Sequence, residues 1–154
     1  MPFGPLPEGT NLYIPTTLVI VVYMLRAIVG MRVKQNYFFG VRTSESLSDP
    51  EIWKEANKKS SFLTLAFTLP LLIANIIFAI LKLPESFPGT ILIIFAIGMI
   101  ALNTYSLKYT QNLAKKKGVE IRKVKFPVYA VITSILITIA LAIVWYLIWH
   151  LIFK

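Results

Sequence analysis

Residues 36–60 read NYFFGVRTSESLSDPEIWKEANKKS and form the polar segment that separates the first two apolar stretches of the chain. The segment contains a helix start, because Ser48 precedes Asp49 and Pro50, and Glu51 follows three residues after the serine. A serine N-cap with a glutamate three residues later is a capping box, and proline is tolerated in the first helical turn. We therefore expect a short helix over residues 49–60 with Ser48 as its N-cap.

This helix is predicted to be amphipathic. Helical spacing places Ile52, Trp53 and Ala56 on one side and Lys54, Glu55, Lys58 and Lys59 on the other. A short helix of this type lies in a membrane surface, with tryptophan at the depth of the headgroups. We expect Trp53 to hold the helix there, and the glutamates to pair with Lys58 and Lys59.

The rest of the chain is long and apolar enough to cross a membrane several times. The 154 residues are 56% hydrophobic and have a mean hydropathy of +0.70, more apolar than an ordinary water-soluble domain. Four stretches reach the length of about 20 residues that a spanning helix needs, namely 12–31, 61–81, 89–109 and 126–153. The predicted fold is a single all-α membrane domain over residues 1–154, with four transmembrane helices and a short interfacial helix between the first and second.

The distribution of charge predicts an orientation. The net charge is +9, and the cations gather in the first and third connections: Arg32, Lys34, Arg42, Lys54, Lys58 and Lys59, then Lys115, Lys116, Lys117, Arg122, Lys123 and Lys125. Basic connections stay on the cytoplasmic side, so we expect a multi-pass protein of the cell membrane with both termini outside. Such connections also attract anionic lipids. Because topology accounts for the charge, we expect no nucleic-acid partner.

The residue types that carry most enzyme chemistry are sparse. The chain has no cysteine and a single histidine, His150, which has no second histidine or nearby acid to form a metal site and is predicted to lie at the outer interface. No glycine-rich phosphate loop and no nucleophile, base and acid set can be recognised. We therefore expect a binding protein without catalytic residues, metal or cofactor.

Three polar side chains inside the predicted spans are candidates for an intramembrane site. Asn75 and Asn103 carry amides that need partners in hydrocarbon, so they either join helices or line a polar pocket. The same two alternatives are open for the hydroxyl groups of Thr104 and Ser106 in the third span. Arg26 either extends to cytoplasmic phosphates or faces the interior of the bundle. No predicted span contains Asp or Glu, so an inward Arg26 needs amides, carbonyls, an acid of the first connection or an anionic ligand.

The central segment resembles the signature of the SdpI/YfhL family of small membrane proteins. The family pattern runs from an asparagine through Gly-x-Arg-Thr and a Ser/Thr-Leu-Ser helix start to a tryptophan and an asparagine or histidine. It is matched here by Asn36, Gly40, Arg42, Thr43, Ser46, Leu47, Ser48, Trp53 and Asn57. The resemblance extends over residues 25–105.

The resemblance implies an integral membrane immunity or signal-transduction protein. The namesake of the family protects cells from a secreted peptide toxin, and in the membrane it sequesters a soluble repressor. Asn36, Gly40, Arg42, Thr43, Ser48, Trp53 and Asn57 would then bind a partner or a lipid headgroup, with Gly40 providing a turn that residues with a Cβ cannot adopt. Two functions remain open for the signature, a structural clasp and a docking surface. A small transporter or lipid-handling protein built on Arg26, Asn75 and Asn103 is the alternative function, and the oligomeric state is open.

Overall fold

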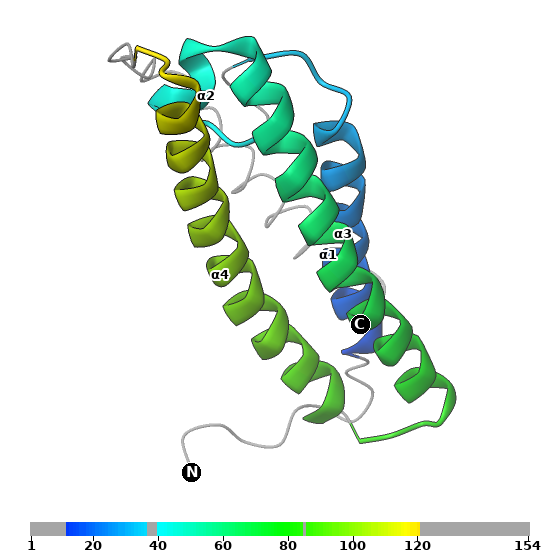
Figure 1. Cartoon of the computed structure of the whole chain (residues 1–154). Coiled ribbons are helices and arrows are strands. Elements are labelled where there is room, and N and C mark those ends of the chain that lie inside the picture. The colour runs from blue at the N-terminus through cyan, green and yellow to red at the C-terminus, as the bar shows by residue number, and fades with distance from the viewer. Residues whose placement is uncertain (1–11, 37–39, 85, 121–154) are drawn as a thin grey trace, which may run out of the picture. The chain divides into compact units, whose positions relative to one another are not determined.

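The computed structural model describes residues 12–36, 40–84 and 86–120, and in these ranges it contains helices and no strand (Figure 1). The helices are α1 (Tyr13–Gly30), α2 (Ser44–Ser48), α3 (Pro50–Ile80) and α4 (Ser86–Lys117). By length and composition, α1, α3 and α4 can each cross a membrane, and they correspond to the first three predicted spans. The predicted span 126–153, with His150, lies outside the described residues.

The predicted helix over residues 49–60 is continuous with the second predicted span. Its residues form the first turns of α3, which continues for 31 residues through Pro70 to Ile80. The predicted sidedness of these turns is correct, since Ile52, Trp53 and Ala56 are buried and the lysines are exposed. Their apolar side faces the protein instead of the membrane surface, because it packs against the chain between α1 and α3. The prediction that Trp53 reaches the headgroups is therefore wrong: its side chain is only 3% exposed.

The predicted N-cap was also one residue early. Asp49 caps α3, and its Oδ1 accepts hydrogen bonds from the backbone N–H of Glu51 at 2.7 Å and of Ile52 at 2.9 Å. Asp49 has an extended backbone, as an N-cap requires, and Pro50 is the first helical residue. Ser48 is instead the last residue of α2, where its Oγ donates to the Ser44 carbonyl at 2.7 Å. An aspartate directly before the proline is the stronger start signal of the two.

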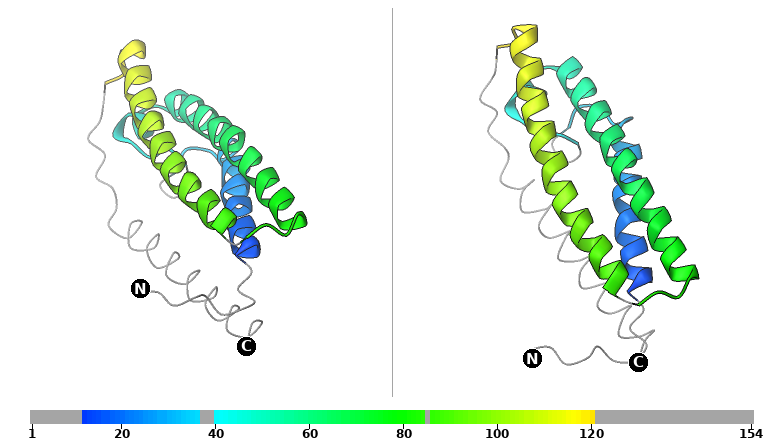
Figure 2. Two further views of the ribbon diagram at one scale, coloured as in Figure 1. Left: turned by 90° about the horizontal axis from the view of Figure 1, so that it is seen from below. Right: turned by 60° about the horizontal axis from the view of Figure 1, so that its bottom comes forward.

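The three long helices lie side by side, and α3 packs against both of the others (Figures 1 and 2). The small apolar core between them consists of Ile20, Ile91 and Phe95, with the ring of Tyr23 edge-on to Phe95 at 5.1 Å between centroids. Gly98 of α4 lies under the Phe67 ring, so a Cβ at this position would collide with the ring. Close packing at small residues is the usual way in which helices associate in lipid.

The helices differ in length, which determines where their ends lie. At a rise of 1.5 Å per residue, α3 and α4 are about 46–48 Å long, whereas α1 with its 18 residues is about 27 Å long. The hydrocarbon core of a bilayer is about 30 Å thick, so parts of α3 and α4 extend beyond it. The first turns of α3 and the last turns of α4 lie at the same end (Figure 1). The first and third connections therefore share one end of the bundle.

Candidate functional site

The turn at Gly40 is fixed by Asn57 of α3. Gly40 has a φ of +86°, a conformation that residues with a Cβ rarely adopt. The next residue, Val41, donates its backbone N–H to Asn57 Oδ1 at 2.7 Å. A Cβ at position 40 would collide with the same Asn57 side chain. Glycine is thus required here both for its backbone angle and for the close approach of the amide.

The residues after Gly40 are fastened by a capping box that the sequence analysis placed elsewhere. Thr43 is the N-cap of α2: its Oγ1 accepts from the Ser46 N–H at 3.1 Å, and Ser46 Oγ accepts from the Thr43 N–H at 3.0 Å. Ser46 Oγ also donates to the Val41 carbonyl at 2.7 Å, and its carbonyl accepts from Gln35 Nε2 at 2.8 Å. The short helix is therefore tied back to the turn and to the chain that leaves α1.

Trp53 and Asn57 complete this arrangement from α3. Trp53 Nε1 donates to the Val33 carbonyl at 3.4 Å, just beyond the end of α1. Asn57 Nδ2 donates to the Trp53 carbonyl at 2.9 Å, so both ends of the buried amide are bonded. These contacts hold residues 40–42 against α3 in one defined position.

A cavity of about 310 Å³ lies beside this folded segment. All three long helices and the turn contribute to its wall: Tyr23, Arg26, Ala27 and Gly30 from α1, Gly40, Val41 and Arg42 from the turn, Asn57, Ser60, Ser61 and Thr64 from α3, and Met99, Asn103, Ser106 and Leu107 from α4. This volume is at the lower limit of small-molecule sites. The cavity is open to the outside of the bundle, because Arg26 and Asn103 are exposed.

The cavity is strongly cationic. Arg26 and Arg42 both line it, and no acidic residue is among its described lining residues. The Arg26 guanidinium carbon lies 6.0 Å from the centre of the Tyr23 ring, within the range of a cation–π contact. Hydroxyl and amide groups make up much of the remaining polar wall. Such a wall favours an anion and can donate several hydrogen bonds to it.

The family model of the SdpI/YfhL proteins matches residues 32–106, from the residues after α1 to Ser106 in α4. These residues are an SdpI/YfhL-family region. The match confirms the resemblance that the signature indicated, and together with the three apolar helices it identifies a membrane protein. Comparison with curated proteins found no match, and neither did comparison with solved structures.

Only some of the predicted signature residues reach the cavity. Gly40, Arg42 and Asn57 line it. Thr43 caps α2 and Trp53 donates to the Val33 carbonyl, and neither lines the cavity. Asn36 donates from Nδ2 to the Lys34 carbonyl at 2.7 Å and, like Ser48, does not line the cavity. The SdpI/YfhL signature is therefore mostly a folding unit that presents a few groups to one site.

Of the predicted intramembrane site of Arg26, Asn75 and Asn103, the structure brings only Arg26 and Asn103 together. Arg26 and Asn103 line the cavity, but Asn75 is fully buried elsewhere, between α3 and the start of α1. Asn75 Nδ2 donates to the Tyr13 carbonyl at 3.0 Å and to Thr17 Oγ1 at 2.9 Å. Its Oδ1 is buried without a hydrogen-bond partner among the described residues. Asn75 thus joins two helices, the alternative to lining a polar pocket.

The hydroxyl groups that α3 contributes to the cavity were not predicted from the sequence. Ser60, Ser61 and Thr64 follow Asn57 at spacings of three and four residues, so they continue its side of the helix. This periodicity of polar residues at the start of an apolar span was the signal that could have indicated a lined site. Ser106 was a candidate for joining helices or lining a pocket, and it lines the cavity while its Oγ donates to Ser60 Oγ at 3.0 Å.

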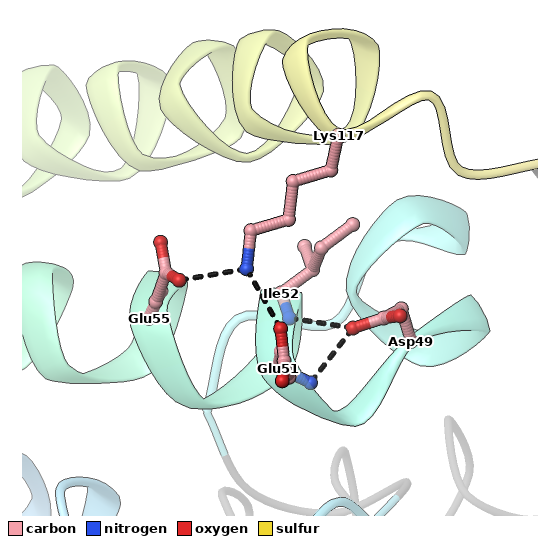
Figure 3. Close-up of polar contacts among 5 residues, drawn as sticks. All are labelled: Asp49, Glu51, Ile52, Glu55 and Lys117. Atoms are coloured by element: carbon pink, nitrogen blue, oxygen red, sulfur yellow. Dashed lines mark hydrogen bonds and ion pairs between the residues drawn. The ribbon is translucent and has the colours of Figure 1, made fainter.

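A charged contact joins the start of α3 to the end of α4 (Figure 3). Lys117 Nζ lies 2.7 Å from Glu55 Oε1 and 3.2 Å from Glu51 Oε2, so the predicted pairing of these glutamates with Lys58 and Lys59 is wrong. Hydrogen bonding to Glu55, and next to Glu51, raises the pKa of Lys117 above its ordinary value of 10.5. Lys117 lies beyond residue 109, where the predicted span ends, and its ammonium keeps its charge at physiological pH.

Proposed function

We propose that this chain is an integral membrane protein of the immunity or signal-transduction type, which binds a peptide toxin, a cytoplasmic regulator or both. The observation that carries the proposal is the folded SdpI/YfhL signature, which forms one wall of an open cationic cavity. Its turn is held by a hydrogen bond to the buried Asn57 amide, so the turn is positioned before a partner arrives. The function is binding and involves no catalysis.

The proposed location is the cell membrane, with the basic connections on the cytoplasmic side. The support is the clustering of cations in the first and third connections, and the Lys117 contact that brings these connections to one end. In this orientation the end of the bundle that carries the signature faces the cytoplasm. A soluble regulator would meet the exposed lysines of α3 and the last turn of α4 there.

A survival assay tests the immunity function. Sensitive cells that express the chain, Arg42→Ala or Lys58→Ala are challenged with the peptide toxin against which the namesake of the family protects. Lys58 is the matched control, since it is an exposed cation outside the cavity. We expect the wild-type chain and Lys58→Ala to protect, and Arg42→Ala to lose protection. Survival equal to that of cells without the chain, for every variant, would contradict the immunity function.

The second candidate function is that of a small transporter or lipid-handling protein. It is favoured by one specific observation, the presence of Arg26 and Asn103 on the cavity wall at the depth of the spans. Asn75 takes no part in it. This function predicts that the chain binds a lipid or small anion in the absence of any toxin or regulator.

A further inference from the structure

We propose that the cavity binds the phosphate group of one anionic membrane lipid, with Arg26 and Arg42 as its cationic ligands. This inference rests on the second candidate function, for which it names the ligand, and it does not depend on the proposed immunity function. The shared chemistry is that of a phosphate ester anion. The source that the structure favours is a phospholipid of the cytoplasmic leaflet.

The described lining residues of the cavity carry positive charge and no carboxylate. Arg26 and Arg42 come from different elements and meet at one cavity, and no acid lines it among the described residues. In the same described ranges, Arg26 forms no ion pair with a carboxylate. A cation within a membrane-spanning helix is costly unless an anion or water compensates it. A phosphate supplies this charge, and its oxygens match the planar donors of two guanidinium groups.

The cavity lies near the ends of the three predicted spans that line it. Arg26 lies four residues before the end of α1, which is about 6 Å along the helix axis. Ser61 is the first residue of the second predicted span, and Ser106 lies within one turn of the end of the third. Three helices thus place the cavity at the boundary between hydrocarbon and headgroups. This is the level at which a bilayer phosphate lies, so a lipid needs little displacement to enter.

The polar wall of the cavity lies beside an exposed apolar surface of α4. Hydroxyl and amide donors from Ser60, Thr64 and Asn103 line the cavity beside the arginines. Leu107 and Met99 also line it, and the outer surface of α4 continues as large exposed apolar side chains such as Ile100, which is 68% exposed. A phosphate fits the first surface and acyl chains fit the second. An entirely soluble anion would leave the apolar surface unused.

Native mass spectrometry of the full-length chain in detergent tests the proposal. The chain is titrated separately with phosphatidylglycerol, with diacylglycerol of the same acyl chains, and with inorganic phosphate. We expect one phosphatidylglycerol per chain and at least about tenfold weaker binding of diacylglycerol, because the charge-assisted contacts are lost. Arg26→Gln with Arg42→Gln should weaken phosphatidylglycerol binding by a similar factor. Lys82→Gln, which removes an exposed cation in the short connection between α3 and α4, at the opposite end of the bundle, should leave it unchanged.

Two outcomes would overturn the proposal. One is equal phosphatidylglycerol binding by the wild-type chain and the arginine double variant, with both folded by circular dichroism. The other is saturation of the chain by inorganic phosphate without binding of phosphatidylglycerol, which would assign the site to a soluble anion. Neither outcome bears on the toxin assay. Failure of the lipid site and failure of the immunity function are therefore distinguishable.

Discussion

At Gly40 the chain depends on the absence of a side chain for two separate reasons. The φ of +86° disfavours any residue with a Cβ, and the Asn57 amide occupies the space that the Cβ would fill. The same amide satisfies the Val41 N–H, so displacing it leaves a partly buried donor without this partner. The conformation of the turn and the cavity wall therefore depend on each other.

Gly40→Ala should destabilise the folded chain by at least about 1–2 kcal/mol, because alanine is strained at positive φ and pushes Asn57 away. Thermal unfolding in detergent, followed by circular dichroism, measures the effect. Gly89→Ala is the matched control: Gly89 is helical and its Cβ would meet no atom within 4 Å. The control should be neutral or more stable by up to about 1 kcal/mol. Equal losses for both variants would contradict the account of Gly40.

At this scale the sequence predicted residue types better than residue contacts. Glycine at position 40 was predictable from its turn context, because few other residues adopt positive φ. The buried state of Trp53 was not, since an amphipathic helix beside a membrane can direct its apolar side to lipid or to protein. The choice depends on the chain after α1, whose Val33 carbonyl accepts the indole N–H. No local pattern contains that information.

At the scale of elements, α3 combines two tasks in one continuous helix. Its first turns carry the signature residues Trp53 and Asn57, and its later turns are apolar and long enough to cross a membrane. A movement of the spanning part would therefore be transmitted directly to the signature. The contact between Ser60 and Ser106 joins this helix to α4 at the level of the cavity.

A cysteine pair tests the alignment of α3 on α4 that places Ser60 beside Ser106. The native chain contains no cysteine, so Ser60→Cys with Ser106→Cys introduces the only two thiols. We expect them to form a disulfide on mild oxidation, because the two serine Oγ atoms are 3.0 Å apart. Ser61→Cys with Ser106→Cys is the control, since Ser61 approaches Gly30 of α1. Peptide mass spectrometry detects the bond; equal cross-linking of both pairs would contradict the register.

The elements themselves were largely predictable, and their interactions were not. Hydropathy over about 20 residues located α1, α3 and α4, because bilayer thickness imposes that length. Hydropathy cannot determine which side of a helix meets which neighbour. Asn75 and Asn103 looked alike in sequence, yet one joins α3 to α1 and the other lines the cavity. Lys117 and its two glutamates belong to separate connections, and only the packing of α3 on α4 brings them together.

At the scale of the whole described unit, the Lys117 contact gives the bundle a polar end. Exposed lysines of α3, both glutamates and the last turn of α4 gather there, opposite the short connection between α3 and α4. Tyr13 marks that other end, where its hydroxyl donates to the Leu83 carbonyl at 2.9 Å. The positive-inside rule predicts that the polar end is cytoplasmic.

Single cysteines test this orientation in intact cells. Glu45→Cys and Lys116→Cys should resist a membrane-impermeant maleimide added from outside, whereas Ser86→Cys should react. All three positions lie in loops or at helix ends at known ends of the bundle. Labelling after cell lysis shows that each thiol is reactive. Reaction of position 45 or 116 from outside would reverse the proposed orientation.

The short α1 makes the protein sensitive to the thickness of the membrane that contains it. With about 27 Å against a hydrocarbon layer of about 30 Å, this helix has no surplus length, unlike α3 and α4. Such hydrophobic mismatch is relieved by local thinning of the bilayer, which draws the lipid surface inward around the short helix. Arg26 lies on that helix, so a bilayer with longer acyl chains would move the surface away from it. The length of the acyl chains would thereby change how readily a lipid phosphate occupies the cavity beside Arg26.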